Sequence, residues 1–274
     1  MEWVSKLKYD EMCEKVNLER FNKFKVYRTY ILERLQNSPF KLLTFFVENL
    51  TAYRRVFYSI YGEDAIIMGL MDRYAMQSGK KLNLSYIDIG AWRPIKGSNT
   101  YFLYKMGSTG TVVEPNPHFK SVWKAVRPKD SYLAFGCGLE KSADLQIFHP
   151  GAASNTFSLT FAEEISATQA HKVTNSITVP LKTLREIISG HIANSDLPFM
   201  LDIDIEGMDY AVISSYDFPN GLRPIIILIE DKPPTGDSQD SSLIENYLNS
   251  QNYKLVARTV VTAVYVDENS NLGI

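Results

Sequence analysis

The chain has 274 residues, of which 45% are hydrophobic and 22% charged, and its formal net charge is −2. This composition is typical of a globular protein with a sizeable core, and a near-neutral charge without a long basic run excludes generic nucleic-acid binding. The sequence lacks a membrane-spanning apolar run and the apolar core of a signal peptide, and its two cysteines, Cys13 and Cys137, lie far apart, so we expect a cytoplasmic protein.

Residues 1–60 are predicted to form a helical extension. Aromatic and aliphatic residues recur at helical spacing between Leu18 and Tyr27, and a second such run follows Pro39, which suits the first turn of a helix. We favour a helical cap on the domain that follows. A dimer interface, which would make the protein a homo-oligomer, and a membrane-surface helix are the alternatives.

Residues 61–274 are predicted to form one α/β domain. Helices are expected over 64–77, from about Ser98, and over 240–250. Short apolar runs predict strands, and the last two strands are close enough in the chain to form a hairpin. The strands predicted for the sheet are 84–89, 111–114, 132–136, 199–205, 225–230, 253–256 and 259–266, and two further predicted strands, 144–148 and 176–179, flank a polar stretch. Together these elements predict a doubly wound, seven-stranded, mostly parallel sheet with one antiparallel strand.

The first two predicted strands each end in an acidic residue beside a glycine or a proline. The first strand leads into Asp88-Ile89-Gly90-Ala91, and the second ends in Glu114-Pro115-Asn116-Pro117. The first motif would place a turn beneath a nucleotide-like cofactor, and the second a carboxylate that accepts hydrogen bonds from two ribose hydroxyls. The turn lacks the glycines of a dinucleotide site, which favours a nucleoside without phosphates. S-adenosylmethionine is such a ligand, so the two motifs predict a methyltransferase.

A wider set of motifs extends this pattern in chain order from about Tyr61 to Tyr265. The motifs are Tyr61-Gly62-Glu63-Asp64, Tyr86-Ile87-Asp88-Ile89-Gly90-Ala91, Ser98-Asn99-Thr100-Tyr101, Val113-Glu114-Pro115-Asn116-Pro117, Leu201-Asp202-Ile203-Asp204-Ile205-Glu206-Gly207 and Arg223–Glu230. This set resembles the FkbM family of S-adenosylmethionine-dependent methyltransferases. The resemblance implies a Rossmann-like class I methyltransferase fold for residues 61–274. It also implies O-methylation, because members mostly methylate sugars or hydroxyl groups of natural products and surface polysaccharides.

A first group of residues is predicted to bind the cofactor. Asp88 would hold the ammonium of its methionine moiety, the backbone at Gly90 and Ala91 would let it approach, and Glu114 would span the ribose diol. An aspartate that only caps a turn is the alternative for Asp88, and a plain glycine turn is the alternative for Gly136. The set is completed by Pro115, Asn116, Gly136 and Cys137 around the ribose and adenine, and by Glu63, Ser98, Asn99 and Asp202.

Acidic residues at the ends of the fourth and fifth predicted strands form the candidate catalytic group. Asp202, Asp204 and Glu206 share one face if the fourth strand continues that far, and the fifth strand ends in Glu230 and Asp231. Like charges on one face are costly unless they pair or bind a cation. One of Asp204, Glu206 and Glu230 could be a general base. Alternatively, Asp204, Glu230 and Asp231 could bind Mg²⁺ or Mn²⁺, or the cluster could be a structural network.

The polar stretch 151–176 is too long for a simple connection, so we expect a lid or an acceptor-binding loop. Ser154, Asn155 and Thr156 would suit an acceptor rich in hydroxyl groups. The expected function is S-adenosylmethionine-dependent O-methylation of a sugar hydroxyl in a glycan, a surface polysaccharide or a glycosylated metabolite. The alternatives are O-methylation of a non-sugar small molecule and a catalytically silent binding subunit with the same fold.

Overall fold

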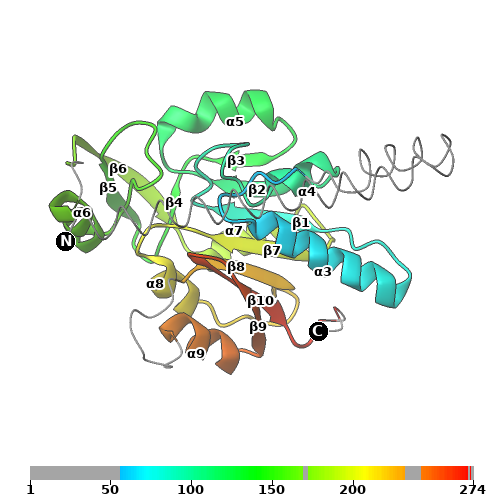
Figure 1. The fold of residues 1–274 in the computed structure, drawn as a ribbon. Coiled ribbons are helices and arrows are strands. Elements are labelled where there is room, and N and C mark those ends of the chain that lie inside the picture. Colours follow the sequence, from blue (N-terminus) through cyan, green and yellow to red (C-terminus); the bar gives the residue numbers. More distant parts are fainter. Residues whose placement is uncertain (1–55, 169–171, 232–241, 271, 273–274) are drawn as a thin grey trace, which may run out of the picture. The chain divides into compact units, whose positions relative to one another are not determined.

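The computed structural model describes residues 56–168, 172–231, 242–270 and 272, which contain two β-sheets (Figure 1). The larger sheet has seven strands, in the spatial order β3 (Ser131–Leu133), β2 (Gly110–Val113), β1 (Ser85–Ile89), β7 (Phe199–Ile203), β8 (Ile226–Glu230), β10 (Thr262–Asp267) and β9 (Tyr253–Arg258). Strand β10 runs antiparallel to both of its neighbours, and the other adjacent pairs are parallel. The predicted α/β class with a mostly parallel seven-stranded sheet is therefore confirmed.

The predicted helical extension over 1–60 lies outside the described residues except for its last five positions, and it stays a prediction. The described helices are α3 (Glu63–Ser78), α4 (Tyr101–Lys105), the 3₁₀ turn η1 (Pro117–Phe119), α5 (Lys120–Val126), α6 (Leu159–Thr168), α7 (Leu184–Ile192), α8 (Asp209–Ser214) and α9 (Leu243–Ser250). Among these helices, not one combines the length and the apolarity that a membrane crossing would require.

Both faces of the larger sheet are covered by helices. Along β1 the side chains alternate, so that Ile87 and Ile89 enter one hydrophobic core while Tyr86 enters another. Helices α7, α8 and α9 contribute to the first core, and α3, α4 and α5 to the second. Burial on both faces explains why β1, β2, β7 and β8 are nearly continuous apolar runs, and it leaves their carboxyl ends as the edge where loops gather.

Two helix starts differ from expectation. The helix predicted from about Ser98 begins at Tyr101, and the Ser98 hydroxyl accepts the backbone N–H of Tyr101 at 3.2 Å. Helix α7 was not predicted, although Thr183 and Glu186 form a capping box at its start. That pair, spaced by three residues before an apolar run, is a signal that could have located α7.

The strand predicted over 259–266 begins only at Thr262, as β10, and two other predicted strands end at least two residues earlier than expected. The strand over 132–136 is divided, because the chain leaves the larger sheet after Leu133 and forms β4 (Gly136–Cys137). A Cβ atom at Gly136 would lie 2.6 Å from the Leu181 side chain, so glycine permits this close approach to β6 (Asn175–Lys182). The strand predicted over 199–205 ends at Ile203. Asp204 and Glu206 consequently lie in the following loop.

The stretch 151–176 is not one irregular loop. It contains α6, and its end is the start of β6, which pairs antiparallel with β5 (Ser142–Ile147). Strands β4, β6 and β5 form the separate three-stranded sheet (Figure 1). The irregular segment before α6, 148–158, crosses the carboxyl ends of the larger sheet and contributes to the cleft described next.

Candidate active site

A cleft of about 490 Å³, including space open to solvent, lies at the carboxyl ends of β1, β2 and β7. It brings together many of the predicted site residues with apolar side chains from the small sheet. Its walls include Gly90, Trp92, Glu114, Pro115, Asn116, Phe119, Gly136, Cys137, Leu145, Ala152, Ala153, Asn155, Phe157, Asp204 and Glu206. Trp92, Phe119 and Phe157 were not predicted as site residues, because only the fold brings their aromatic rings to this edge.

Gly90 is required by the protein itself at the floor of the cleft. Its backbone has a φ of 83°, and a Cβ atom there would lie 1.8 Å from the carbonyl oxygen of Asp204. The backbone N–H of Asp204 in turn donates to the carbonyl of Ile89 at 3.0 Å. The turn after β1 and the loop after β7 are therefore in direct contact, which only a residue without a side chain permits.

Glu114 is buried at the end of β2, with its carboxylate held by backbone donors. The N–H of Trp92 donates to Oε2 at 2.8 Å and the N–H of Asn116 to Oε1 at 2.7 Å. Burial raises the pKa of Glu114 to about 7 although these two hydrogen bonds oppose it, and the charge of Asp88 raises it further. Each carboxylate oxygen retains a further lone pair for a ligand in the cleft.

Trp92 connects Glu114 to the segment that crosses the cleft. Its backbone lies in the left-handed region, with a φ of 46°. Its indole N–H donates to the carbonyl of Gly151 at 3.1 Å, and its own carbonyl accepts from the indole of Trp123 at 2.9 Å. Left-handed backbone at a large residue is strained and persists only when the surroundings hold it, as these bonds do.

Asn155 and Thr156, two polar residues of the segment 148–158, are already engaged within the protein. Asn155 bonds the backbone of Phe148 and His149, and the Thr156 hydroxyl donates to the carbonyl of Glu206 at 2.7 Å. The amide of Asn116 similarly donates to the carbonyl of Pro150 at 2.8 Å. These bonds fix the segment across the cleft, so they account for Asn155 and Thr156 without an acceptor molecule.

A second group of predicted residues is buried beside the cleft and does not form its walls. Asp88 and Asp202 are register partners on the adjacent strands β1 and β7. Asp88 accepts from the hydroxyl of Thr100, and Asp202 accepts from the side-chain amide of Asn99 at 3.3 Å. Burial, followed by the neighbouring charge of Asp88, raises the pKa of Asp202 well above its ordinary value. Such a pair favours a shared proton or a cationic ligand.

Glu63 lies close enough to Asp202 for its charge to raise the pKa of that residue further. Its carboxylate accepts from the hydroxyl of Thr259 at 2.7 Å and from the backbone of Tyr61 at 3.0 Å. Ser98 is buried and accepts from Arg127, and Ala91 is buried in the core on the α3 side of the sheet. Arg127 was not predicted as a site residue, because a lone arginine after a helix carries no motif.

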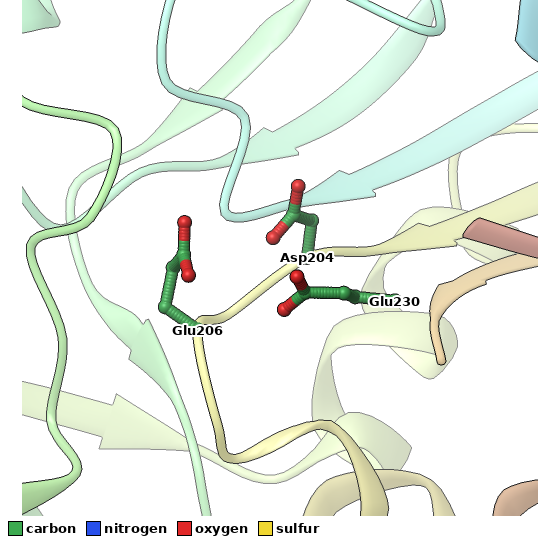
Figure 2. Close-up of side chains that lie close together, drawn as sticks. All are labelled: Asp204, Glu206 and Glu230. Carbon is green, nitrogen blue, oxygen red and sulfur yellow. The ribbon is translucent and has the colours of Figure 1, made fainter. Parts of the chain in front are cut away.

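Three carboxylates meet where β7 and β8 end (Figure 2). Asp204, Glu206 and Glu230 each contribute one oxygen to a set that lies within 4.8 Å of one another. Asp204 lines the cleft and is exposed there. Desolvation of its carboxyl, followed by repulsion from Glu206 and Glu230, raises the pKa of Asp204 well above its ordinary value. The group can hold a proton or a hard cation.

The local fold explains how Glu206 joins this group. Glu206 has a left-handed backbone, with a φ of 50°, in the turn between β7 and α8. Asp209 stabilises the turn by accepting the backbone N–H of Ile205 at 3.1 Å and of Gly207 at 3.2 Å. The chain bends at Glu206, and Figure 2 shows the Glu206 carboxylate on the same side of the loop as those of Asp204 and Glu230.

Asp231 is separate from the three grouped carboxylates. It is buried, and it forms an ion pair with Arg258 at 2.8 Å and accepts from the hydroxyl of Ser242 at 2.7 Å. The predicted metal set was Asp204, Glu230 and Asp231. In the structure Glu206, and not Asp231, stands beside the other two.

The comparison with known protein families agrees with these observations. Residues 88–255 match the model of a family described as the Methyltransferase FkbM domain. No curated protein and no solved structure matches the chain at a significant level. The matched range begins at Asp88 and includes Glu114, Asp202, Asp204 and Glu230. Because this range covers more than half of the sequence, the chain belongs to the FkbM methyltransferase family.

Proposed function

We propose that this protein is an S-adenosylmethionine-dependent O-methyltransferase with a doubly wound, Rossmann-like domain over 61–274 and a helical extension over 1–60. The observation that carries the proposal is the order of carboxylates along one edge of the sheet. Glu114 follows β2, Asp88 lies on β1, Asp202 on β7, and Glu230 on β8, and these four strands are neighbours in that order. Along this edge, Glu114 would bind the ribose diol, Asp88 and Asp202 would bind a cationic group, and Glu230 would belong to the cluster that accepts a proton.

The residues fit this cofactor group by group. Glu114 would accept hydrogen bonds from both ribose hydroxyls, since its carboxylate faces the cleft and is held by backbone donors. Asp88 and Asp202 would take the ammonium of the methionine moiety, because the described residues supply only neutral hydrogen-bond donors to these two carboxylates. Pro115, Asn116, Gly136 and Cys137 would surround the adenosine.

The bound cofactor would supply a methyl group carried on a sulfonium, and the acceptor oxygen would attack that methyl group. The protein must remove a proton from that acceptor hydroxyl, and Asp204, Glu206 and Glu230 are the candidate group for this step. The raised pKa of Asp204 brings the carboxylate closer to the basicity that a general base needs near neutral pH. We assign the base to Asp204, with Glu206 and Glu230 maintaining its raised pKa.

A divalent cation is the alternative occupant of this group. Three carboxylate oxygens within 4.8 Å of one another suit the oxygen coordination of Mg²⁺ or Mn²⁺. Chelation separates the alternatives, because methyl transfer that survives EDTA requires only a protein base. Activity that is lost with EDTA and restored by Mg²⁺ or Mn²⁺ would assign the group to a metal.

The acceptor is proposed to be a sugar hydroxyl of a glycan, a surface polysaccharide or a glycosylated metabolite, as the family resemblance implies. A non-sugar hydroxyl compound is the second candidate. A catalytically silent binding subunit is disfavoured, because such a subunit has no need for three carboxylates beside the cofactor cleft.

Isothermal titration of the full chain with S-adenosylmethionine and, separately, with NAD tests the proposal. We expect S-adenosylmethionine to bind and NAD not to bind, because the turn after β1 lacks the glycines that a pyrophosphate requires. Binding of NAD alone, or of neither compound, would show that the proposed cofactor is wrong.

A further inference from the structure

A buried arginine lies behind the Asp88 end of the site. Arg127 follows α5 and is only 1% exposed. Its guanidinium lies over the rings of Trp123, Tyr86 and Tyr104, at 4.4, 5.2 and 5.3 Å from their centroids. An arginine keeps its charge under all physiological conditions, so the surrounding groups must compensate this charge in the interior.

Asp130 provides this compensation and anchors the arginine to the sheet. Its Oδ2 lies 2.6 Å from Nε of Arg127, and both side chains are fully buried. Its Oδ1 accepts from the hydroxyl of Tyr86 at 2.7 Å and from the backbone N–H of Gly110 at 3.0 Å. The ion pair is therefore fixed to both β1 and β2, and the position of the guanidinium is well determined.

The other guanidinium nitrogens of Arg127 reach the loop between β1 and α4. One donates to the carbonyl of Pro94 at 3.4 Å and to the hydroxyl of Ser98 at 3.2 Å. The other donates to the hydroxyl oxygen of Thr100 at 3.1 Å, and the Thr100 hydroxyl donates to Asp88. A hydroxyl has a single proton. Because Arg127 occupies an acceptor position of Thr100, that proton is directed to the carboxylate of Asp88.

The same loop also serves the second carboxylate of the pair. Asn99, next to Thr100, donates its side-chain amide to Asp202. By bonding the loop at Pro94, Ser98 and Thr100, Arg127 holds the two residues that contact Asp88 and Asp202. If Arg127 only packed in the protein core, it would not need hydrogen bonds to three residues of this loop.

We propose that Arg127 is a positioning residue for cofactor binding, which acts through the Thr100 hydroxyl to fix the carboxylate of Asp88. The inference rests on the proposed function, since it takes the cofactor ammonium as the ligand of Asp88. Burial raises the pKa of Asp88 above its ordinary value. The positive charge of Arg127 opposes this effect and so favours the ionised form that an ammonium needs.

Substitutions at Thr100 test the relay, that is, the hydrogen bonds from Arg127 through the Thr100 hydroxyl to Asp88, without removing the buried charge of Arg127. Thr100→Val preserves the shape of the side chain and removes the hydroxyl, whereas Thr100→Ser preserves the hydroxyl. Thr111→Val is the matched control, because Thr111 is also buried and hydrogen-bonded, to His191, but lies at the opposite end of its strand from the cleft. Titration of each full-length variant with S-adenosylmethionine, together with its melting temperature, gives affinity and stability separately.

We expect Thr100→Val to weaken S-adenosylmethionine binding by about tenfold or more, as for loss of a hydrogen bond to a charged group. Thr100→Ser and Thr111→Val should stay within about threefold of the parent affinity, whatever their melting temperatures. The relay would be overturned if Thr100→Val and Thr111→Val weakened S-adenosylmethionine binding equally, or if Thr100→Ser bound it as weakly as Thr100→Val. If the unsubstituted protein does not bind S-adenosylmethionine, both the proposed function and this inference are wrong. If it binds and Thr100→Val binds equally well, only the inference is wrong.

Arg127→Lys, alone and combined with Thr100→Val, tests the role of the arginine directly. Lysine retains the charge but cannot reach Asp130, Ser98 and Thr100 together. If Arg127 acts through Thr100, the double variant should bind S-adenosylmethionine about as weakly as the weaker single variant. Additive losses would show that Arg127 does not act through Thr100. Circular dichroism identifies the folded variants, and the Thr100 pair tests the bond from the Thr100 hydroxyl to Asp88 whether or not Arg127→Lys folds.

Discussion

At the scale of single residues, Glu114 should make the affinity for S-adenosylmethionine depend on pH. Burial raises its pKa to about 7, so its carboxylate is mostly protonated at pH 6 and mostly ionised at pH 8. Two ribose hydroxyls can donate fully only to the ionised form. The affinity for S-adenosylmethionine should therefore rise about tenfold from pH 6 to pH 8, following the ionised fraction of a group with this pKa.

Glu114→Gln is the control for this effect. The amide offers one acceptor oxygen and does not titrate, so binding should be weak at both pH values and the dependence should be much reduced. Calorimetric titration at pH 6, 7 and 8 provides the measurement. A glutamine variant with the same pH dependence as the parent would assign the titrating group elsewhere.

Asp204 makes a different prediction, because it lies among the proton-accepting carboxylates and not at the ribose. Asp204→Asn should lower the turnover of methyl transfer by about 100-fold or more, the usual effect of losing a general base. Its affinity for S-adenosylmethionine should remain within about threefold of the parent, since its hydrogen-bonding shape is preserved. Transfer of labelled methyl groups to a panel of oligosaccharides measures the first quantity, and calorimetry the second. Full activity in this variant would remove Asp204 from the mechanism.

At the scale of elements, the segment 148–158 is held across the cleft by side chains from other elements. Trp92 and Asn116 bond the carbonyls of Gly151 and Pro150, and Thr156 bonds that of Glu206. Trp92→Phe keeps an aromatic ring and removes the indole donor. The rate of cofactor dissociation should rise by up to about tenfold, because a net hydrogen bond contributes about 0.5–1.5 kcal/mol. Stopped-flow fluorescence of the remaining tryptophans, Trp3 and Trp123, measures this rate. An unchanged dissociation rate would show that the segment does not restrain the cofactor.

The elements that could be predicted from the sequence are those whose signal is local. Strands β1, β2, β7 and β8 are apolar runs with clear ends, and the predicted ends differ by at most two residues from those observed. The division of the third strand was not predictable, because it depends on Leu181, far along the chain, packing against Gly136.

The candidate site shows the same limit. The acidic residues at strand ends could be placed from the strands alone, since parallel strands carry their carboxyl ends to one edge. Glu206 was expected beside Asp204 on a continuing strand, but it reaches Asp204 and Glu230 through a left-handed turn. The separation of Asp231 from this group could not be predicted, because it depends on an ion pair with Arg258. Arg127 was missed for a related reason, since its partners at Ser98, Thr100 and Asp130 become neighbours only in the folded chain.

At the scale of the whole molecule, His191 on α7 links the neighbouring strands β1 and β2 at the end of the sheet opposite the cleft. It is buried between the hydroxyls of Ser85 on β1 and Thr111 on β2, at 2.9 and 3.0 Å. Burial lowers its pKa to about 4, below its ordinary value of 6.5. Between these values the unfolded chain binds more protons than the folded chain, so this contribution to stability is present above pH 6.5 and is lost as the pH falls toward 4.

His191→Gln tests this contribution, because glutamine is neutral and keeps a donor and an acceptor. The melting temperature of the parent should fall more steeply from pH 6.5 to pH 4.5 than that of the variant. Differential scanning calorimetry across this range measures both. Parallel curves for the two proteins would mean that His191 does not couple folding to pH.

The central claim is that the row of carboxylates along the sheet edge receives S-adenosylmethionine in one orientation. A crystal structure of the chain with S-adenosylhomocysteine, the product form of the cofactor, tests this claim most directly. The account predicts both ribose hydroxyls at about 2.7 Å from the Glu114 carboxylate and the amino group beside Asp88 and Asp202. The sulfur should face Asp204. A ribose bound away from Glu114, or a reversed ligand with its amino group at Glu114, would contradict it.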